Sequence, residues 1–342
     1  MAGLDPATQV GGGAAGSNFD HRVKPGDDDK KCRERELDMS KAAVVGLGTM
    51  GPGIAQTLAR AGMEVIAFDV SEDQRKKAGD GLTMANNVLN ALGVPEKGKI
   101  PVKIAGSLQE CLANATLVVE TVPEKLEIKA SVFKEIDKLV DKKCIIASNT
   151  SGIPITKLQE NVSAPERVVG MHWSNPPHII PMIEVIAGDK TSQATVTWMV
   201  DQIKALGLLP VVVQKDVPGF VENRVLYALL RECVDLVDQG VIDAEGLDTC
   251  VSWGIGYKLS VIGPMALLDM AGLDIYQAVG SYLNKELCNR GDLSPYVTER
   301  TKAGKLGMKT GGGVFSYTPE KIAELRQLRA KRLVAVRKAL ES

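Results

Sequence analysis

The sequence has few aromatic residues and histidines, and its six cysteines stand far apart. Aromatic side chains make up 4% of the 342 residues, and the only histidines are His21, His172 and His178. The cysteines lack the close pairs of a zinc site or a redox dithiol, which argues against both and fits a reducing cytosol. No metal site is expected, because His172 has no neighbouring His, Asp or Cys at ligand spacing.

The sequence also lacks an excess of either charge and a long apolar run. Its 41 basic residues nearly balance 42 acidic ones, so no general field attracts nucleic acid or an anionic membrane. No apolar run is long enough for the core of a signal peptide or for a membrane span. We therefore expect a cytoplasmic protein whose partner is a small molecule.

Residues 1–38 differ from the rest of the chain. They are rich in glycine and charge and have almost no apolar periodicity, which predicts a disordered extension. Translation that begins at Met39, just before the first predicted strand, is an alternative interpretation of this segment.

A glycine-rich turn follows the first apolar run, in the segment AAVVGLGTMGPGIAQTLARAGMEVIAFD. Gly46, Gly48 and Gly51 leave no β-carbon where a pyrophosphate approaches the backbone at a helix N-terminus. The pattern predicts a dinucleotide site, and an ordinary glycine-rich turn is the alternative. The turn residues expected at the cofactor also include Thr49 and Met50.

An acidic residue ends the apolar run after this turn. Asp69 lies 18 residues after Gly51, about where the second strand presents a carboxylate to the ribose 2′-hydroxyl of the adenosine. A carboxylate there disfavours a 2′-phosphate. The expected cofactor is therefore NAD rather than NADP.

Short apolar strands alternate with amphipathic helices up to residue 216. This alternation predicts an α/β fold over residues 39–216, a Rossmann-like doubly wound sheet that binds its ligand at the carboxyl ends of the strands. Beyond the first unit, the expected helices cover 72–92, 124–140 and 192–206, and the expected strands cover 102–105, 116–120, 144–148, 167–171, 182–186 and 209–213.

The pattern changes after Asp216, where strand-like runs almost vanish. We expect an all-helical C-terminal domain over residues 217–342. Its predicted helices cover 221–239, 264–278 and 319–340, and the first carries an apolar stripe of Leu226, Leu229, Leu230, Val234 and Val237. Several arginines and lysines lie on the last helix, which we interpret as the solvated face of a packing helix rather than a recognition helix.

One histidine is well placed for catalysis. His172 ends a predicted strand of the first domain, and an imidazole with a pKa near 6.5 can take the hydroxyl proton of an alcohol as hydride leaves for NAD. Glu184, 12 residues further on, could accept the other ring N–H and fix the tautomer. A structural histidine is the alternative, although few other residues in the chain could serve as the base.

Five segments occur in the order typical of one enzyme family. They are GLGTMGPGIA, VVETVPE, ASNTSGIPIT, GMHWSNPP with the later IEVI, and DVPGFVENR. In these segments the chain resembles the L-3-hydroxyacyl-CoA dehydrogenase family from Lys41 to about Tyr317. The resemblance implies a Rossmann-like domain, a helical domain that forms a homodimer, and His172 as the catalytic acid and base paired with Glu184.

The same resemblance implies roles for further residues. Ser151 and Asn223 match the family residues that contact the substrate oxygen. The positions that match the nicotinamide and ribose contacts of the family are Glu124, Lys129, Asn149, Asn175 and Lys309. Each of these has an ordinary structural alternative: an acidic residue at a helix N-terminus for Glu124, an exposed helical lysine for Lys129 and a turn former for Asn149 are examples.

The chain departs from acyl-CoA members of the family in two places. The stretch GLTMANNVLNALGVPEKGKIPVKI lacks the early lysines that meet the phosphates of coenzyme A, and HWSNPPHIIP replaces the usual HFFNPxP. These features resemble the CoA-independent branch, and most closely a pyridine-carboxylate dehydrogenase of vitamin B6 degradation. That resemblance implies oxidation of a hydrated aldehyde, which needs no catalytic thiol.

A carboxylated substrate needs a cation, and Arg231 is the candidate. It lies eight residues after Asn223, about two turns along the same helical face. A salt bridge with Glu232 or Asp235 is the alternative. For His178, a place at the rim of the site is favoured over a contact with substrate.

Three hypotheses follow for the function. The first is an NAD-dependent dehydrogenase of a small CoA-free carboxylate that carries a formyl or hydroxyl group. The second is a short-chain 3-hydroxybutyryl-CoA dehydrogenase whose CoA contacts come from Lys97, Lys99 and Lys103. The third is a non-catalytic nucleotide-binding protein, which the presence of His172, Glu184 and Asn223 disfavours.

Overall fold

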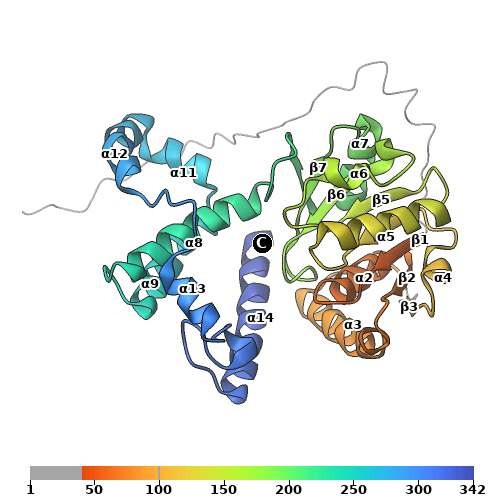
Figure 1. The fold of residues 1–342 in the computed structure, drawn as a ribbon, viewed down its shortest axis with the longest axis horizontal. Coiled ribbons are helices and arrows are strands. Elements are labelled where there is room, and N and C mark those ends of the chain that lie inside the picture. Colours follow the sequence, from red (N-terminus) through yellow and green to blue (C-terminus); the bar gives the residue numbers. More distant parts are fainter. Residues whose placement is uncertain (1–40, 99–100) are drawn as a thin grey trace, which may run out of the picture. The chain divides into compact units, whose positions relative to one another are not determined.

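An eight-stranded sheet is the centre of the first half of the computed structural model, which describes residues 41–98 and 101–342 (Figure 1). The expected disordered extension at 1–38 therefore lies outside the described residues, as does Lys99. The strands are β1 (Lys41–Val45), β2 (Glu64–Phe68), β3 (Lys103–Ile104), β4 (Leu117–Glu120), β5 (Ile145–Ser148), β6 (Val168–Trp173), β7 (Met182–Ala187) and β8 (Leu209–Val213).

The strands lie in the order β3-β2-β1-β4-β5-β6-β7-β8, and all neighbours are parallel except β6 and β7. β2 and β3 are added on one side of β1, whereas β4 and the later strands are added on its other side, so the strand order reverses between β1 and β4. In open α/β sheets, ligands bind at the carboxyl ends of the strands at such a point. The helices that connect the strands are α2 (Gly51–Arg60), α3 (Glu72–Leu92), α4 (Leu108–Leu112), α5 (Leu126–Leu139), α6 (Ile155–Gln159) and α7 (Gln193–Ala205).

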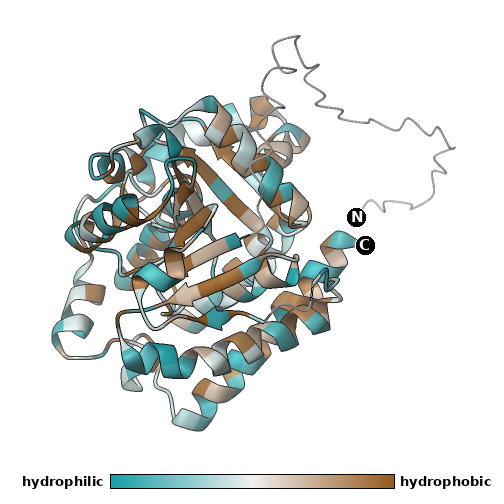
Figure 2. Ribbon diagram, turned by 90° about the vertical axis from the view of Figure 1, so that its right-hand side faces the viewer, coloured by the Kyte–Doolittle hydropathy of each residue, from teal (hydrophilic) through white to brown (hydrophobic). Residues whose placement is uncertain are grey.

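The central strands are buried along their whole length. Every residue of β4, β5 and β6 is buried, which explains why they read as continuous apolar runs rather than as alternating patterns. The core they share with the helices includes Val118, Phe133, Ile136, Ile146 and Ile155. Figure 2 shows the apolar strands within the sheet.

Helices alone follow β8, apart from isolated bridges near Gly312. The predicted fold class, a Rossmann-like sheet followed by helices, is confirmed. The predicted domain division between 216 and 217 lies between β8 and α8 and stays a prediction. The helices are α8 (Glu222–Asp238), α9 (Ala244–Cys250), the π-helix η2 (Val251–Gly256), α10 (Tyr257–Leu259), α11 (Pro264–Ala271), α12 (Leu273–Glu286), α13 (Pro295–Lys302), the 3-10 helix η3 (Met308–Thr310) and α14 (Pro319–Glu341).

The single helix predicted over 264–278 is wrong. The chain forms two helices there, because Gly272 has φ +99° and ends α11 before α12 begins. The apolar stripe expected on α8 is present but not buried within the chain, and Leu226 and Leu230 are more than 40% exposed.

No single helix among residues 41–98 and 101–342 is long and apolar enough to cross a membrane. One pair of helices, Ala244–Leu259 with Pro264–Ala271, reaches that length and composition only when the two are taken together, and it is bent by 87°.

Candidate active site

His172 and Glu184 face each other across the antiparallel pair β6 and β7. The strand register places the two residues directly opposite, and His172 Nδ1 lies 2.7 Å from Glu184 Oε2. Both residues are buried, with 5% and 1% of their surface exposed. A carboxylate on Nδ1 favours the tautomer with its proton there, which leaves Nε2 able to accept a proton.

The N-terminus of α8 binds the other oxygen of Glu184. The N–H groups of Val221 and Glu222 donate to Glu184 Oε1 at 2.9 and 3.0 Å. Burial raises the pKa of Glu184, but the hydrogen bonds from His172 and these two N–H groups outweigh it and hold the pKa below its ordinary value. Glu184 is therefore ionised at neutral pH and stabilises an imidazolium at His172.

The glycine turn after β1 fits a pyrophosphate. A β-carbon on Gly46 would lie 2.6 Å from the carbonyl oxygen of Thr121, and one on Gly51 would lie 2.0 Å from that of Gly46, so neither position accepts a side chain. Gly48 has open space around it, and the N–H groups of Gly48 and Thr49 have no hydrogen-bond partner among the described residues. These N–H groups, at the uncapped N-terminus of α2, suit an anion.

Asp69 lies beside this turn at the end of β2. Its Oδ2 accepts a hydrogen bond from the N–H of Leu47 at 2.8 Å, and its Oδ1 accepts one from Ser71 at 2.8 Å. A carboxylate has about four acceptor positions, so these bonds orient Asp69 and leave room for ribose hydroxyls.

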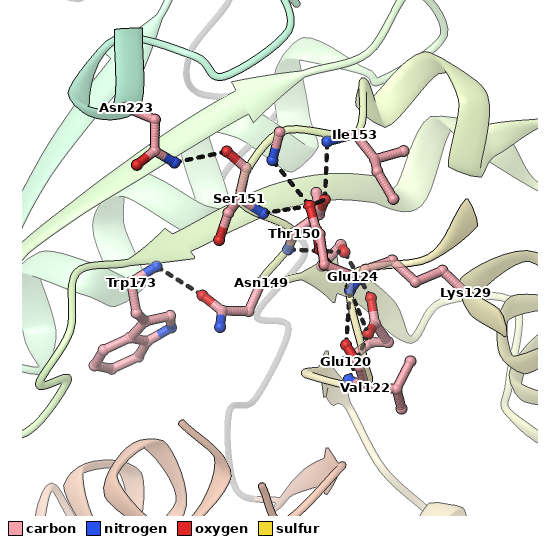
Figure 3. A network of polar contacts seen from close by, with 12 residues as sticks. Glu120, Val122, Glu124, Lys129, Asn149, Thr150, Ser151, Ile153, Trp173 and Asn223 are labelled. Atoms are coloured by element: carbon pink, nitrogen blue, oxygen red, sulfur yellow. Dashed lines mark hydrogen bonds and ion pairs between the residues drawn. The ribbon is translucent and has the colours of Figure 1, made fainter. Parts of the chain in front are cut away.

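A buried ionic network lies beside the ends of β4 and β5 (Figure 3). Lys129 is 1% exposed, and its Nζ lies 2.8 Å from Glu120 Oε1 and 3.4 Å from Glu124 Oε2. Glu124 Oε1 accepts hydrogen bonds from Thr150 and from the N–H groups of Ser151 and Gly152. The alternative interpretation of Lys129 as an exposed helical lysine is therefore wrong; its contact with the cofactor stays a prediction.

Several predicted site residues meet near the carboxyl end of β5. The side-chain amide of Asn223, on α8, donates to the carbonyl of Ser151 at 2.8 Å (Figure 3). Asn149 Oδ1 accepts from the N–H of Trp173, next to His172, at 2.8 Å. These bonds connect the loop after β5 with both β6 and α8.

Other predicted residues lie in different surroundings. Asn175 belongs to the loop after β6, where its carbonyl accepts a hydrogen bond from Arg329 of α14. Lys309 is exposed in η3, and no contact with the other predicted site residues is recorded for it within residues 41–98 and 101–342. The expected rim position of His178 is wrong, because this residue is 8% exposed and packs against Gly53 of α2. Burial lowers the pKa of His178.

A cavity of about 1080 Å³ lies beside Ser151 and Asn223. Arg231 lines it, and neither a salt bridge nor a hydrogen bond joins this side chain to another described residue, so the predicted alternative partners Glu232 and Asp235 do not bind it. Arg290 also lines the cavity and lies 3.9 Å from both Asp235 and Asp238. Sequence reasoning missed Arg290, since only the fold brings residue 290 back to α8.

Glu222 and Ser174 are further residues that sequence reasoning missed. The Ser174 hydroxyl donates to Glu222 Oε1, and one oxygen of Glu222 lies within 4.8 Å of a ring nitrogen of His172 and an oxygen of Glu184. Three such groups could hold a metal ion. The only signal in the sequence was the position of Glu222 next to Asn223.

Comparisons with known proteins identify the family of the chain. The NAD-binding domain of 3-hydroxyacyl-CoA dehydrogenase matches residues 41–217, and the C-terminal domain of the same enzymes matches residues 219–317. The 5-formyl-3-hydroxy-2-methylpyridine 4-carboxylate 5-dehydrogenase of Mesorhizobium japonicum is 60% identical over 301 residues, which cover 87% of this chain and 97% of that protein.

Solved structures give the same result. A crystal structure of 5-formyl-3-hydroxy-2-methylpyridine 4-carboxylic acid 5-dehydrogenase, described as an NAD⁺-dependent dismutase, has a TM-score of 0.88 and 59% identity, covering 89% of this chain and 99% of that one. The (S)-3-hydroxybutyryl-CoA dehydrogenase of Ralstonia eutropha has a TM-score of 0.66 and 34% identity, covering 82% and 100%.

The chain belongs to the 3-hydroxyacyl-CoA dehydrogenase family. It is an NAD-dependent oxidoreductase, as the sequence predicted. The hypothesis of a non-catalytic nucleotide-binding protein is therefore disfavoured. The individual roles of the site residues stay predictions.

Proposed function

We propose that this protein oxidises a small CoA-free aldehyde that carries a carboxylate, and that its substrate is 5-formyl-3-hydroxy-2-methylpyridine-4-carboxylate. The proposal rests on the buried His172–Glu184 pair and on a cavity beside Ser151 and Asn223 that is lined by the unpaired Arg231. The 60% identity to the Mesorhizobium japonicum enzyme supports this substrate. A place in vitamin B6 degradation is part of the proposal.

In the proposed reaction, His172 moves the proton. Bound NAD supplies the hydride acceptor. His172 Nε2 takes a proton from one hydroxyl of the hydrated aldehyde, and the ionised Glu184 stabilises the imidazolium that forms. The carbonyl of the product acid forms at the same carbon.

Two of the described cysteines, Cys111 and Cys144, are buried and poorly suited to a thiol mechanism of aldehyde oxidation. Burial raises the pKa of both Cys111 and Cys144 to about 12, so neither forms a thiolate at neutral pH. This disfavours covalent catalysis by either of these two thiols.

Lys97 and Lys103, two of the three lysines of the alternative CoA site, already have partners. Lys97 Nζ donates to the carbonyl of Ala205 at 3.0 Å, and Lys103 lies 2.8 Å from Glu110. Phosphate groups would have to compete with these partners. This observation favours the CoA-free substrate over 3-hydroxybutyryl-CoA.

The substrate assignment is tested by offering both compounds with NAD⁺ and following NADH by its absorbance. We expect turnover of the formylpyridine carboxylate with a kcat/KM at least about 100-fold above that of 3-hydroxybutyryl-CoA, a difference of about 2.7 kcal/mol. Efficient turnover of the thioester alone would contradict the proposal.

We also propose that the protein is a homodimer. The described helices from α8 to α14 bury no residue within the chain, and large apolar side chains are exposed on them, among them Trp253, Tyr257, Met265 and Met270. Such a surface suits a second copy of the chain. A cytoplasmic location completes the proposal, and cell fractionation tests it.

A further inference from the structure

Glu222 adds a second carboxylate to the surroundings of His172. It is the first residue of α8, and its backbone N–H donates to Glu184 Oε1 at 3.0 Å. A ring nitrogen of His172, an oxygen of Glu184 and an oxygen of Glu222 all lie within 4.8 Å of one another. The fold thus brings two carboxylates to one imidazole, although the proton transfer described above uses only one.

The two oxygens of Glu222 have different surroundings. Oε1 accepts the hydrogen bond from Ser174, whose side chain is 3% exposed. Oε2 is buried and has no hydrogen-bond partner among residues 41–98 and 101–342. A buried polar oxygen without a donor costs about 1–3 kcal/mol, so Oε2 is available to accept a hydrogen bond or a proton from a bound molecule.

The hydrogen bonds of the cluster favour proton transfer over a metal ion. Glu184 Oε2 is bonded to His172 Nδ1, and Glu184 Oε1 accepts two backbone N–H groups. A metal would have to displace these bonds. Oε2 of Glu222 is the free carboxylate acceptor of the group.

We propose that Glu222 activates the water molecule that hydrates the aldehyde before its oxidation. As the water oxygen bonds to the formyl carbon, Glu222 Oε2 takes one proton of the water. The electron pair of the C=O π bond moves to the formyl oxygen, which takes a proton from the imidazolium of His172. The product is the gem-diol, and the carbon is neither oxidised nor reduced in this step. The proposal rests on the proposed function.

Hydration prepares His172 for the following step. The imidazole is neutral once it has protonated the formyl oxygen, and the neutral form is the one that accepts a hydroxyl proton during oxidation. The net oxidation consumes the aldehyde, water and NAD⁺ and gives the acid, NADH and one proton, which Glu222 releases. Reduction of the same aldehyde to an alcohol by NADH consumes no water, so it does not require Glu222.

This difference between the two reactions defines the experiment. Glu222→Gln keeps the shape of the side chain but removes its basicity. We expect the rate of aldehyde oxidation by NAD⁺ to fall about 100-fold, within the range of general base catalysis. Reduction of the aldehyde by NADH is expected to stay within about twofold of the parent rate, which also shows that the variant is folded.

A second measurement needs no nicotinamide. Exchange of ¹⁸O from labelled water into the formyl group, followed by mass spectrometry, reports hydration directly. The parent protein should accelerate the exchange over the uncatalysed rate, whereas Glu222→Gln should not. Glu245→Gln, an exposed glutamate at the start of α9, is the matched control and should behave as the parent in both experiments.

Ser174 is a positioning residue in this proposal. Ser174→Ala removes the donor to Glu222 Oε1 and should slow oxidation and ¹⁸O exchange together, by less than Glu222→Gln does. A variant that slows oxidation without slowing the exchange would contradict this role.

The failures of the two proposals are distinguishable. Unchanged oxidation in Glu222→Gln, or equal losses of oxidation and reduction, overturns the role of Glu222 while the proposed substrate stands. Absence of both activities in the parent protein overturns the substrate and the role of Glu222 together.

Discussion

The two halves of the described chain differ in what they bury. Residues 41–213 contain nearly all of the buried side chains, including strands that are buried along their whole length. From residue 214 onward, only Phe220 and Ser294 are buried among the described residues. The first half therefore carries a core of its own, whereas the helices of the second half expose their apolar faces.

Apolar residues in the sequence therefore have a different meaning in the strands of the first half and in the helices of the second half. A buried strand and an exposed apolar helix face look alike in composition, because both are rich in Leu, Ile and Val. In the sheet the apolar residues fill the core of the same chain. On α8 to α12 they remain exposed in the single chain, and we propose that a second copy covers them. An apolar pattern therefore predicts burial but does not show whether the same chain or another one buries it.

The largest expected effect concerns the site in the first half. His172→Gln removes the proton acceptor, and we expect kcat to fall by about 10²- to 10⁴-fold. NAD affinity, measured by the quenching of tryptophan fluorescence, should change little. Activity equal to that of the parent protein would exclude His172 as the acid and base.

Removal of a buried charge tests the core of the same half. Lys129→Met leaves Glu120, which is fully buried, without its ion partner, and we expect the free energy of unfolding to fall by about 3–5 kcal/mol. Lys138→Met is the matched control, since its pair with Glu135 is exposed and should contribute less than about 1 kcal/mol. Equal losses in urea denaturation would contradict this assignment.

Arg231 lies on α8, in the second half, and lines the same cavity as Ser151 of the first half. Arg231→Met should raise the KM for the carboxylated aldehyde about 10- to 100-fold, as expected for a charged hydrogen bond of about 1.5–3 kcal/mol. The Kd for NAD should remain the same. If the KM did not change in steady-state kinetics, the substrate carboxylate would bind elsewhere.

The exposed faces of the second half lead to a prediction about association. Trp253 is 73% exposed in the single chain, and Trp253→Asp should raise the dimer Kd about 30-fold, or about 2 kcal/mol, if a second copy covers it. Light scattering over a dilution series measures this change. An unchanged dimer, or a parent protein that is monomeric at every concentration, would count against the proposed interface.

The smallest expected effect is a dependence of stability on pH. The pKa of Glu184 is lower in the folded chain than its ordinary value of 4.5, so its ionised form stabilises the fold above that pH. This contribution is lost as the pH falls through the folded pKa. Glu184→Gln should therefore lose less stability than the parent between pH 6 and pH 3, measured by thermal unfolding. A parallel loss in both proteins would show that Glu184 does not contribute.

Much of the fold follows from the sequence. The glycine turn, the spacing of Asp69 and the apolar runs predicted the strands and the longer helices up to β8, because each is a local signal. The short helices α4 and α6 were not predicted. The helix break at Gly272 was missed because an isolated glycine does not show whether its φ is positive. The pairing of His172 with Glu184 was predicted from a spacing of 12 residues, and it arises because β6 and β7 are antiparallel neighbours.

The rest of the site depends on contacts between distant segments. Glu222 reaches Ser174 over 48 residues, and Arg290 reaches the acidic side chains of α8 from the loop after α12. No local pattern marks either residue. The burial of Lys129 could not be predicted from the sequence either, since a helical lysine is usually exposed.

A crystal structure of the protein with NAD and the formylpyridine carboxylate would test the central claim most directly. We expect His172 Nε2 at about 2.6–3.2 Å from the oxygen of the formyl group, with the nicotinamide ring beside the same carbon. A complex in which the imidazole points away from both molecules would contradict it.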